Sequence, residues 1–251
     1  MAEKIKNLNI ICYKWGDLYS PYYVNILYRM VKRNLSTPHK FHCITDDPEG
    51  ISDGIFVHKL PDYGIEGIWR KLMTFQPNFL GLQNQFVVSI DIDVVVIGSL
   101  DFLANEPDKD FIVAKNWSRK GAKASGCLYR LRVGSHCEIW NNFISNPEKA
   151  IDKYHGKNRL IGEQNWLNAH YNSFNYFPLD KVVSFKKHCR SKGHIWKIGS
   201  FELFNTAKFG NAKPPKGAAL VSFHGEPSPE QVSDNHYGRW RQAPFVKKHW
   251  K

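Results

Sequence analysis

The feature that most constrains the fold is an apolar, β-branched run from Phe86 to Ile97, in which the only acidic residues are Asp91 and Asp93. β-Branched residues favour strands, so we predict a strand over Phe86–Ile90 and a second over Val94–Ile97. The break between these runs places the acidic pair at the carboxyl end of the first strand. In open α/β sheets, ligands bind at that end of the strands.

Strands and helices alternate through the first half of the chain. The other predicted elements there are strands over Leu8–Tyr13, Lys40–Thr45 and Ile55–Leu60 and helices over Pro21–Leu35 and Ile68–Phe75. This alternation predicts an α/β fold with a mostly parallel central sheet flanked by helices. Because no repeat or linker divides the 251 residues, we expect a single domain over 1–251.

The second half is less regular. It contains predicted strands over Phe111–Ala114, Gly126–Leu131 and Ala218–Phe223 and predicted helices over Ser135–Phe143 and Gln164–Tyr171. Between Ser191 and Gly217 the chain is polar and interrupted by Gly and Pro, and no element is assigned there.

The acidic pair indicates a metal site. Residues i and i+2 of a strand share a face, so Asp91 and Asp93 are expected to project together. Two carboxylates in an apolar run are costly unless they are paired, hydrogen-bonded or metal-bound. Mg²⁺ or Mn²⁺ is the usual cation at such a site. A strand-end turn with two solvated aspartates is the alternative.

This region resembles the donor half of GT-A glycosyltransferases, in particular the family-8-like galactosyl- and glucosyltransferases and their bacterial relatives. The resemblance is carried by Trp69-Arg70-Lys71-Leu72, Phe75, Pro77, Phe86–Leu100 and the strand ends Tyr13–Gly16 and Thr45–Asp47. It implies a GT-A (Rossmann-like) fold. It also implies that the D-x-D motif, Asp91 and Asp93, binds Mn²⁺ or Mg²⁺ against the diphosphate of the donor.

Two further parts of the donor site follow from the resemblance. Ser222-Phe223-His224-Gly225 is similar to the family's late strand-end motif, which makes His224 the third metal ligand; a neutral imidazole suits Mn²⁺. Pro227 stands where the family often has a lysine that meets the phosphates. Arg70 and Lys71 are therefore the candidate phosphate ligands. A solvated helix face is the alternative for both.

A candidate catalytic segment lies in the second half. Gly162–Asn168 resembles an acidic-Gln motif that opens a helix near the anomeric carbon, and Ala124-Ser125-Gly126 resembles the small-residue motif facing the donor sugar. The resemblance implies that Glu163 binds sugar hydroxyls or is the catalytic carboxylate, with Gln164 beside the reacting centre. From the residues alone, Glu163 suits the positive end of a helix, so a plain helix start is the alternative.

The nucleotide has its own candidate residues. Tyr13 and Trp15 could stack on the base, with ordinary core packing as the alternative. Asp46 follows a strand where the base or ribose would lie, and an Asx turn before Pro48 is the alternative there.

Together these features predict a hexosyltransferase, with residues 1–115 as the donor half and 116–251 as the sugar and acceptor half. The expected donor is a nucleoside-diphosphate sugar, and a UDP-sugar is the first candidate. The acceptor hydroxyl belongs to a glycan or glycolipid in glycan or polysaccharide assembly. The resemblance implies retention of anomeric configuration.

The net charge of +12 implies an anionic partner, which could be nucleic acid, an anionic membrane or a phosphorylated substrate. The basic, aromatic C-terminal tail from Tyr237 to Lys251 suits peripheral contact with an anionic membrane, and a solvated tail is the alternative. A nucleic-acid-binding protein would leave the acidic pair unexplained, and no recognisable module is present, so no nucleic acid is expected. A metal-dependent nuclease or nucleotidyltransferase normally needs a further acidic ligand, for which Asp101 is the only nearby candidate.

The five cysteines are widely spread and have no metal-knuckle spacing, so neither a disulfide framework nor a zinc site is expected. No secretory signal is recognised, and no apolar stretch approaches about 20 residues. We expect a cytoplasmic protein, at most peripheral at the inner face of a membrane.

Overall fold

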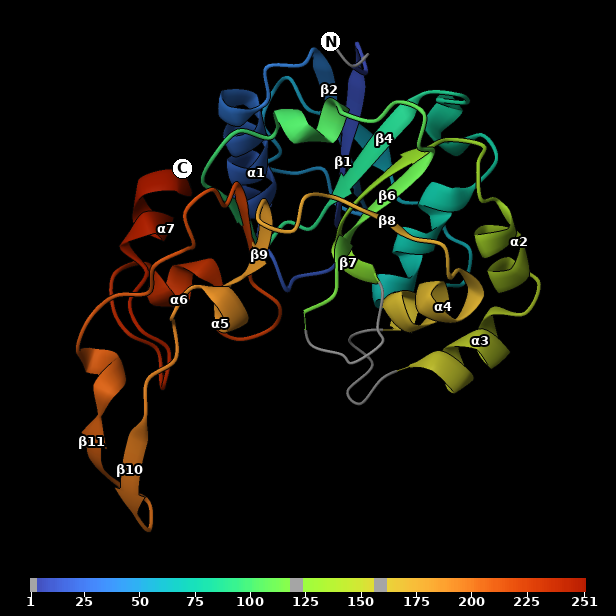
Figure 1. Ribbon diagram of the computed structural model, residues 1–251. Coiled ribbons are helices and arrows are strands. Elements are labelled where there is room, and N and C mark those ends of the chain that lie inside the picture. The colour runs from blue at the N-terminus through green and yellow to red at the C-terminus, as the bar shows by residue number, and fades with distance from the viewer. Residues whose placement is uncertain (1–3, 118–123, 156–161) are drawn as a thin grey trace. The chain divides into compact units, whose positions relative to one another are not determined.

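The computed structural model describes residues 4–117, 124–155 and 162–251 (Figure 1). They form two compact units, which are taken one at a time here. The first contains the described residues of Met1–Val24, Thr37–Asp91 and Leu103–Phe177, and the second contains Asn25–Ser36, Ile92–Phe102 and Pro178–Lys251. The first of the chain's passages from one unit to the other falls within helix α1 (Pro21–Asn34).

The first unit is built on a seven-stranded sheet with the order β3-β2-β1-β4-β7-β6-β8. Its strands are β1 (Leu8–Lys14), β2 (His39–Thr45), β3 (Phe56–Lys59), β4 (Phe86–Ile90), β6 (Phe111–Lys115), β7 (Ala124–Arg132) and β8 (Asn175–Tyr176). Only β7 runs antiparallel to its neighbours. The predicted mostly parallel α/β sheet is therefore confirmed.

Central strands of this sheet are apolar because they are covered on both faces. Every residue of β1 and β4 is buried, whereas no residue of the edge strand β3 is buried. The helices of this unit are η1 (Gly67–Phe75), η2 (Phe79–Gly81), α2 (Glu138–Ile144), α3 (Pro147–Tyr154) and α4 (Gly162–His170), and η3 (Asp101–Ala104) crosses from the second unit into it.

Aromatic packing holds η1, α2 and α4 together. The rings of Trp69 and Phe143 stack with centroids 5.3 Å apart and planes 2° from parallel. Helix α4 begins at Gly162, and a Cβ at that position would overlap the indole of Trp69. Glycine there lets the first turn of α4 approach η1 closely, which brings Glu163 toward the end of the sheet.

The second unit has a three-stranded sheet, β5-β12-β9, and a separate hairpin. Its other elements are β5 (Val94–Val96), β9 (Val182–Ser184), α5 (Phe185–His188), β10 (Ile195–Ile198), β11 (Phe201–Asn205), η5 (Thr206–Lys208), β12 (Leu220–Ser222), α6 (Pro229–Ser233) and α7 (Pro244–His249). The C-terminal segment is folded, since Val246 is fully buried and Trp250 is only 8% exposed.

Some local predictions are wrong. Asp91 and Asp93 do not lie on one strand, because β4 ends at Ile90 and a turn leads into β5, so strand alternation does not orient their side chains. The predicted helix over Ile68–Phe75 is a 3₁₀ helix. The segment left unassigned contains the β10–β11 hairpin.

Two further features concern the cysteines and the lengths of the helices. All five cysteines are free thiols, as expected from their spacing. In the described parts of the chain, no helix has the length and apolar character needed to cross a membrane.

Candidate functional site

The site in the first unit lies at the carboxyl ends of its parallel strands. Strands β1, β2 and β4 run in the same direction and end at Lys14, Thr45 and Ile90, so these ends meet at one edge of the sheet. Asp91 comes directly after β4, and its backbone N–H donates to the carbonyl of Cys127 on β7. The sequence-based placement of Asp91 at a strand end is confirmed.

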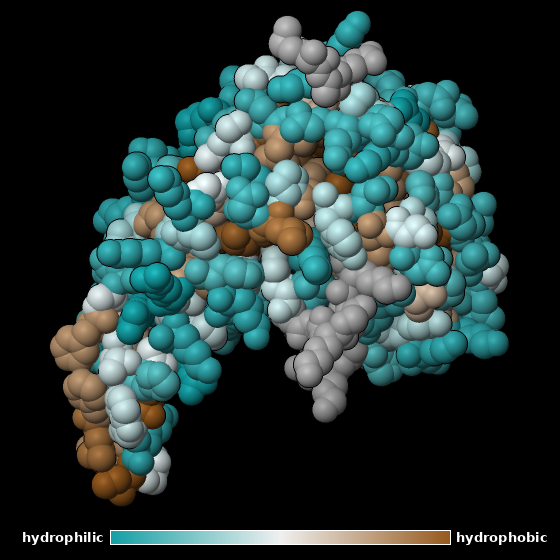
Figure 2. Space-filling model, in the orientation of Figure 1, coloured by the Kyte–Doolittle hydropathy of each residue, from teal (hydrophilic) through white to brown (hydrophobic). Residues whose placement is uncertain are grey.

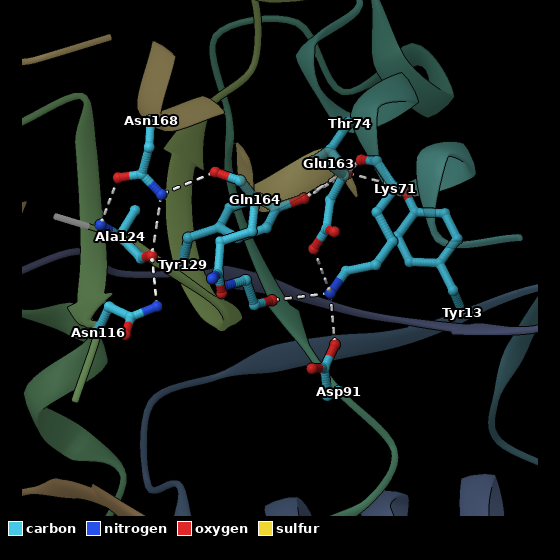
Figure 3. Close-up of polar contacts among 11 residues, drawn as sticks. Tyr13, Lys71, Thr74, Asp91, Asn116, Ala124, Tyr129, Glu163, Gln164 and Asn168 are labelled. Atoms are coloured by element: carbon cyan, nitrogen blue, oxygen red, sulfur yellow. Dashed lines mark hydrogen bonds and ion pairs between the residues drawn. The ribbon is translucent and has the colours of Figure 1, made fainter. Parts of the chain in front are cut away.

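Lys71 is the centre of the polar contacts there (Figure 3). Its ammonium lies 2.5 Å from Asp91 Oδ1, 3.6 Å from Glu163 Oε1 and 2.8 Å from the carbonyl oxygen of Gly126. Burial lowers the pKa of Lys71, but the charges of Asp91 and Glu163 outweigh burial and raise it above its usual value. Lys71 is therefore a permanent cation between two carboxylates.

Glu163 is the most unusual group of the site because it is a buried carboxylate. The residue is 6% exposed, and its Oε2 atom has no hydrogen-bond partner among the residues that the structure describes. Burial raises the pKa of Glu163, while Lys71 acts in the opposite direction. A Cβ at position 126 would overlap Oε1, so Gly126 provides the space that this carboxylate occupies.

Side-chain amides of helix α4 form hydrogen bonds with the backbone at the start of β7 (Figure 3). Gln164 Oε1 accepts from the N–H of Gly126 at 3.0 Å. Asn168, one turn later, accepts from the N–H of Ala124 at 2.9 Å and donates to the carbonyl of Ala124 at 3.2 Å. These contacts fix the first turn of α4 against the strand that contains Ser125, which is itself 7% exposed.

Tyr13 is part of a buried hydroxyl network. Its hydroxyl lies 2.7 Å from Thr74 Oγ1, to which Tyr129 also donates at 2.9 Å. Tyr129 further donates to the carbonyl of Lys71 at 3.3 Å. Tyr13 is 6% exposed, so the core-packing alternative describes its position here.

The remaining donor-site candidates make other contacts. Trp15 is half-buried and packs against the main core of the unit. Asp46 is exposed, and its Oδ2 accepts from the N–H of Gly16 at 3.0 Å. Arg70 donates from Nε to the carbonyl of Ile65, which lies just before η1, at 2.9 Å.

The second unit contains the other two proposed metal ligands. His224 Nε2 lies 2.7 Å from Ser184 Oγ, and the carbonyl of His224 accepts from Lys186 Nζ at 2.7 Å. Burial, followed by the charges of Lys186 and Lys187, lowers the pKa of His224 to about 4, so its imidazole is neutral at neutral pH. Burial lowers the pKa of Lys186, and the charges of Glu226 and Asp93 act in the opposite direction.

The chemistry of the proposed ligands fits a hard cation, since two carboxylates and a neutral imidazole suit Mn²⁺ or Mg²⁺. Asp91 belongs to the first unit, whereas Asp93 and His224 belong to the second. Within the ranges that the structure describes, no group of three or more His, Cys, Asp or Glu side chains could hold a metal ion.

Three members of the site were not predicted from the sequence. Thr74 and Tyr129 have no motif of their own and are identified only by their buried hydrogen bonds. Asn168 did carry a signal, because it lies four residues after Gln164 and so on the same face of the helix.

No protein-family model and no curated protein matches the chain. Among solved structures, the galactosyltransferase LgtC in complex with donor and acceptor sugar analogues is similar with a TM-score of 0.51 and 10% identity, over 88% of this chain and 88% of that one. The glycosyltransferase GlyE from Streptococcus pneumoniae TIGR4 gives a TM-score of 0.46 and 15% identity, over 70% of this chain and 46% of that one. This chain thus spans about half of GlyE. The similarity to LgtC shows a shared fold, an α/β fold with a mostly parallel central sheet.

Proposed function

We propose that the chain is a metal-dependent glycosyltransferase that moves a hexose from a nucleoside-diphosphate sugar to a hydroxyl of a glycan or glycolipid. A UDP-sugar is the first candidate for the donor. The observation that carries this proposal is the buried cluster of Lys71, Asp91 and Glu163 at the carboxyl ends of the strands. Its location is where open α/β sheets bind ligands. The fold shared with LgtC, a galactosyltransferase, supports the same class of reaction.

The assignment of Asp91, Asp93 and His224 to the cation rests on the sequence resemblance, since no three such side chains among the described residues are grouped to hold the cation. When bound, it would act as a Lewis acid that stabilises the negative charge on the departing nucleoside diphosphate. Lys71 fixes one oxygen of Asp91 by its contact of 2.5 Å, while the Asp91 side chain remains 32% exposed. This arrangement orients a carboxylate without enclosing it.

Glu163 is suited to the donor sugar. Within the described part of the chain no group donates to its Oε2, and a sugar hydroxyl would supply a donor. The amide of Gln164, held by the N–H of Gly126, lies on the same helix turn and is the proposed neighbour of the reacting carbon. In the reaction, the bond between the anomeric carbon and the diphosphate oxygen breaks, the acceptor oxygen forms the new bond to that carbon, and the acceptor proton passes to the departing nucleoside diphosphate.

Nucleotide binding is the first test. Thermal unfolding is measured with UDP, GDP, CMP and dTDP, each with Mn²⁺ and with EDTA. Ligand at 100 times its Kd stabilises by about 2.7 kcal/mol, which such a measurement resolves. We expect a metal-dependent shift with one nucleotide that is lost in Asp93→Asn and kept in Asp53→Asn, an exposed acid used as the matched control. No shift with any nucleotide would overturn the proposal.

A second measurement separates the sugar from the nucleotide. If Glu163 contacts the sugar, Glu163→Gln should bind the free nucleoside diphosphate as the wild type does, yet lose the extra affinity gained with the nucleotide sugar. Equal losses for both ligands would place Glu163 outside the sugar contact. NMR of the product's anomeric proton then distinguishes retention, which we propose, from inversion.

A further inference from the structure

The β10–β11 hairpin of the second unit exposes an unusual concentration of large apolar side chains. Their exposed fractions are 52% for Trp196, 70% for Ile198, 78% for Phe201, 61% for Leu203 and 48% for Phe204. Phe209, which follows η5 and stacks on Phe204, is 60% exposed. Figure 2 shows hydrophobic residues gathered along this hairpin, which Figure 1 shows extending from its unit. Contiguous exposed apolar surface of this kind marks an interaction site.

The base of the hairpin is held in place. Asn205 is 2% exposed, and its side chain donates to the carbonyl of Gly238 at 2.9 Å. The N–H of Thr206 donates to the carbonyl of His194 at 2.9 Å. A Cβ at Gly193 would overlap the backbone of Ala207, so the two chain segments are closely packed there. Exposure at the tip therefore belongs to a built element and not to a frayed end.

The surrounding chain is strongly basic. Between Lys186 and Lys216 there are eight Lys and Arg residues and one acidic residue, Glu202. Glu202 is paired with Lys208 at 3.0 Å. This segment thus holds more than half of the net charge of +12.

We propose that the hairpin docks on an anionic lipid bilayer, with its apolar side chains in the interfacial layer and the lysines against the headgroups. Aromatic and aliphatic side chains flanked by lysine suit this interface. Each basic side chain near an anionic surface strengthens binding about fivefold. This inference does not depend on the proposed catalytic function, and it assigns membrane contact to the hairpin instead of the C-terminal tail.

Other occupants fit the hairpin less well. A second copy of the chain would bring two strongly basic segments together, and their charges would repel. Single-stranded nucleic acid would stack on the aromatic rings. It would leave the exposed aliphatic side chains Ile198 and Leu203 without a suitable environment, whereas a bilayer provides one.

The test is co-sedimentation with vesicles of phosphatidylcholine alone or with 30% phosphatidylglycerol. We expect binding to the anionic vesicles only, weakened by salt. Ile198→Ser with Phe201→Ser should weaken it more than tenfold, and Lys192→Gln with Lys197→Gln about twentyfold. These positions are exposed, so folding should persist, which circular dichroism checks.

Matched controls keep the result specific. Leu179→Ser removes an exposed apolar side chain, 61% exposed, elsewhere in the same unit and should bind as the wild type does. The proposal is overturned if the wild type ignores anionic vesicles. It also fails if Lys248→Gln with Lys251→Gln abolishes binding while the hairpin variants bind normally. A third contrary result is that the hairpin variants change only the oligomeric state, or only oligonucleotide binding, in lipid-free solution.

Discussion

Replacing Lys71 by Met tests whether one buried ammonium holds two carboxylates in place. The side chains of Lys71 and Glu163 are 5% and 8% exposed, whereas that of Asp91 is 32% exposed. Removing one partner of a buried ion pair costs about 3–5 kcal/mol, because the other charge is left without compensation. We expect Lys71→Met to lower the free energy of unfolding by about 3 kcal/mol, at the lower end because water can solvate Asp91.

A double-mutant cycle with Glu163→Gln isolates the buried contact. At 3.6 Å and an effective dielectric constant of about 20, the attraction between Lys71 and Glu163 is about 4–5 kcal/mol. Desolvation offsets part of this attraction, so we expect a coupling of about 2 kcal/mol. The double variant should therefore be destabilised by about 2 kcal/mol less than the sum of the single variants, because it buries no unpaired carboxylate at position 163.

The assay is urea unfolding in EDTA, followed by tryptophan fluorescence. Trp69, Trp140 and Trp166 lie in the core of the first unit and report on its unfolding. The exposed pair Lys109–Glu106, at 3.1 Å, is the control, and Lys109→Met should cost less than about 1 kcal/mol. Additive single effects, within about 0.5 kcal/mol, would refute the view that Lys71 holds Glu163.

Three other predictions follow from buried groups of the first unit. His42→Gln should flatten the acid limb of the stability curve. Burial, the largest cause, lowers the pKa of His42 in the folded protein to about 4. The contribution of neutral His42 to stability is complete above the unfolded pKa near 6.5 and is lost as the pH falls toward 4; we expect it to be about 2 kcal/mol after allowing for screening. Urea unfolding at about pH 7.5 and about pH 4.5 measures it. Gly126→Ala should remove binding of the nucleotide sugar in calorimetry, because its Cβ displaces Glu163; unchanged affinity would contradict this. Arg130→Met should lower the free energy of unfolding in urea by more than about 3 kcal/mol, because the buried Arg130 side chain donates to four backbone carbonyls. Arg132 is half-buried, so Arg132→Met should lower it by less than about 1 kcal/mol, and equal losses would contradict this.

The regular part of the fold could be predicted because its burial follows simple patterns. Phe86–Ile90 is a strand with the predicted bounds, since an apolar β-branched run in a covered sheet has few alternatives. The helix over Pro21–Asn34 ends one residue before its predicted limit. Tertiary contacts decide the rest, as in η1, where the predicted helical residues adopt the 3₁₀ form.

The hairpin shows how a usable signal can be overlooked. Gly199 and Ser200 separate two short β-prone runs by two residues, which is a hairpin pattern, and Gly199 has the positive φ of 58° that such turns favour. The polar, Gly- and Pro-rich surroundings obscured it. Its apolar side chains face solvent, so no burial pattern identified the strands.

The candidate site could be predicted as separate residues but not as one cluster. Lys71, Gly126 and Glu163 are far apart in the sequence and were assigned to phosphate, sugar and catalysis, respectively. Those roles remain predictions. In the structure these three residues lie together. Lys71 lies between Asp91 and Glu163, and Gly126 leaves the space that the Glu163 carboxylate fills.

The charge of this cluster explains why it suits binding better than it suits stability. One ammonium faces two carboxylates, so the group carries excess negative charge when both are ionised. No donor to Glu163 Oε2 is found in residues 4–117, 124–155 and 162–251. A purely structural buried ion pair offers little, since apolar replacements are often as stable or more so. The unfavourable energy falls if a cation approaches Asp91 or a hydroxyl donates to Glu163. A metal-bound nucleotide sugar would bring both groups. The Oε2 atom of Glu163 and the partly exposed carboxylate of Asp91 would then both be complementary to a single ligand.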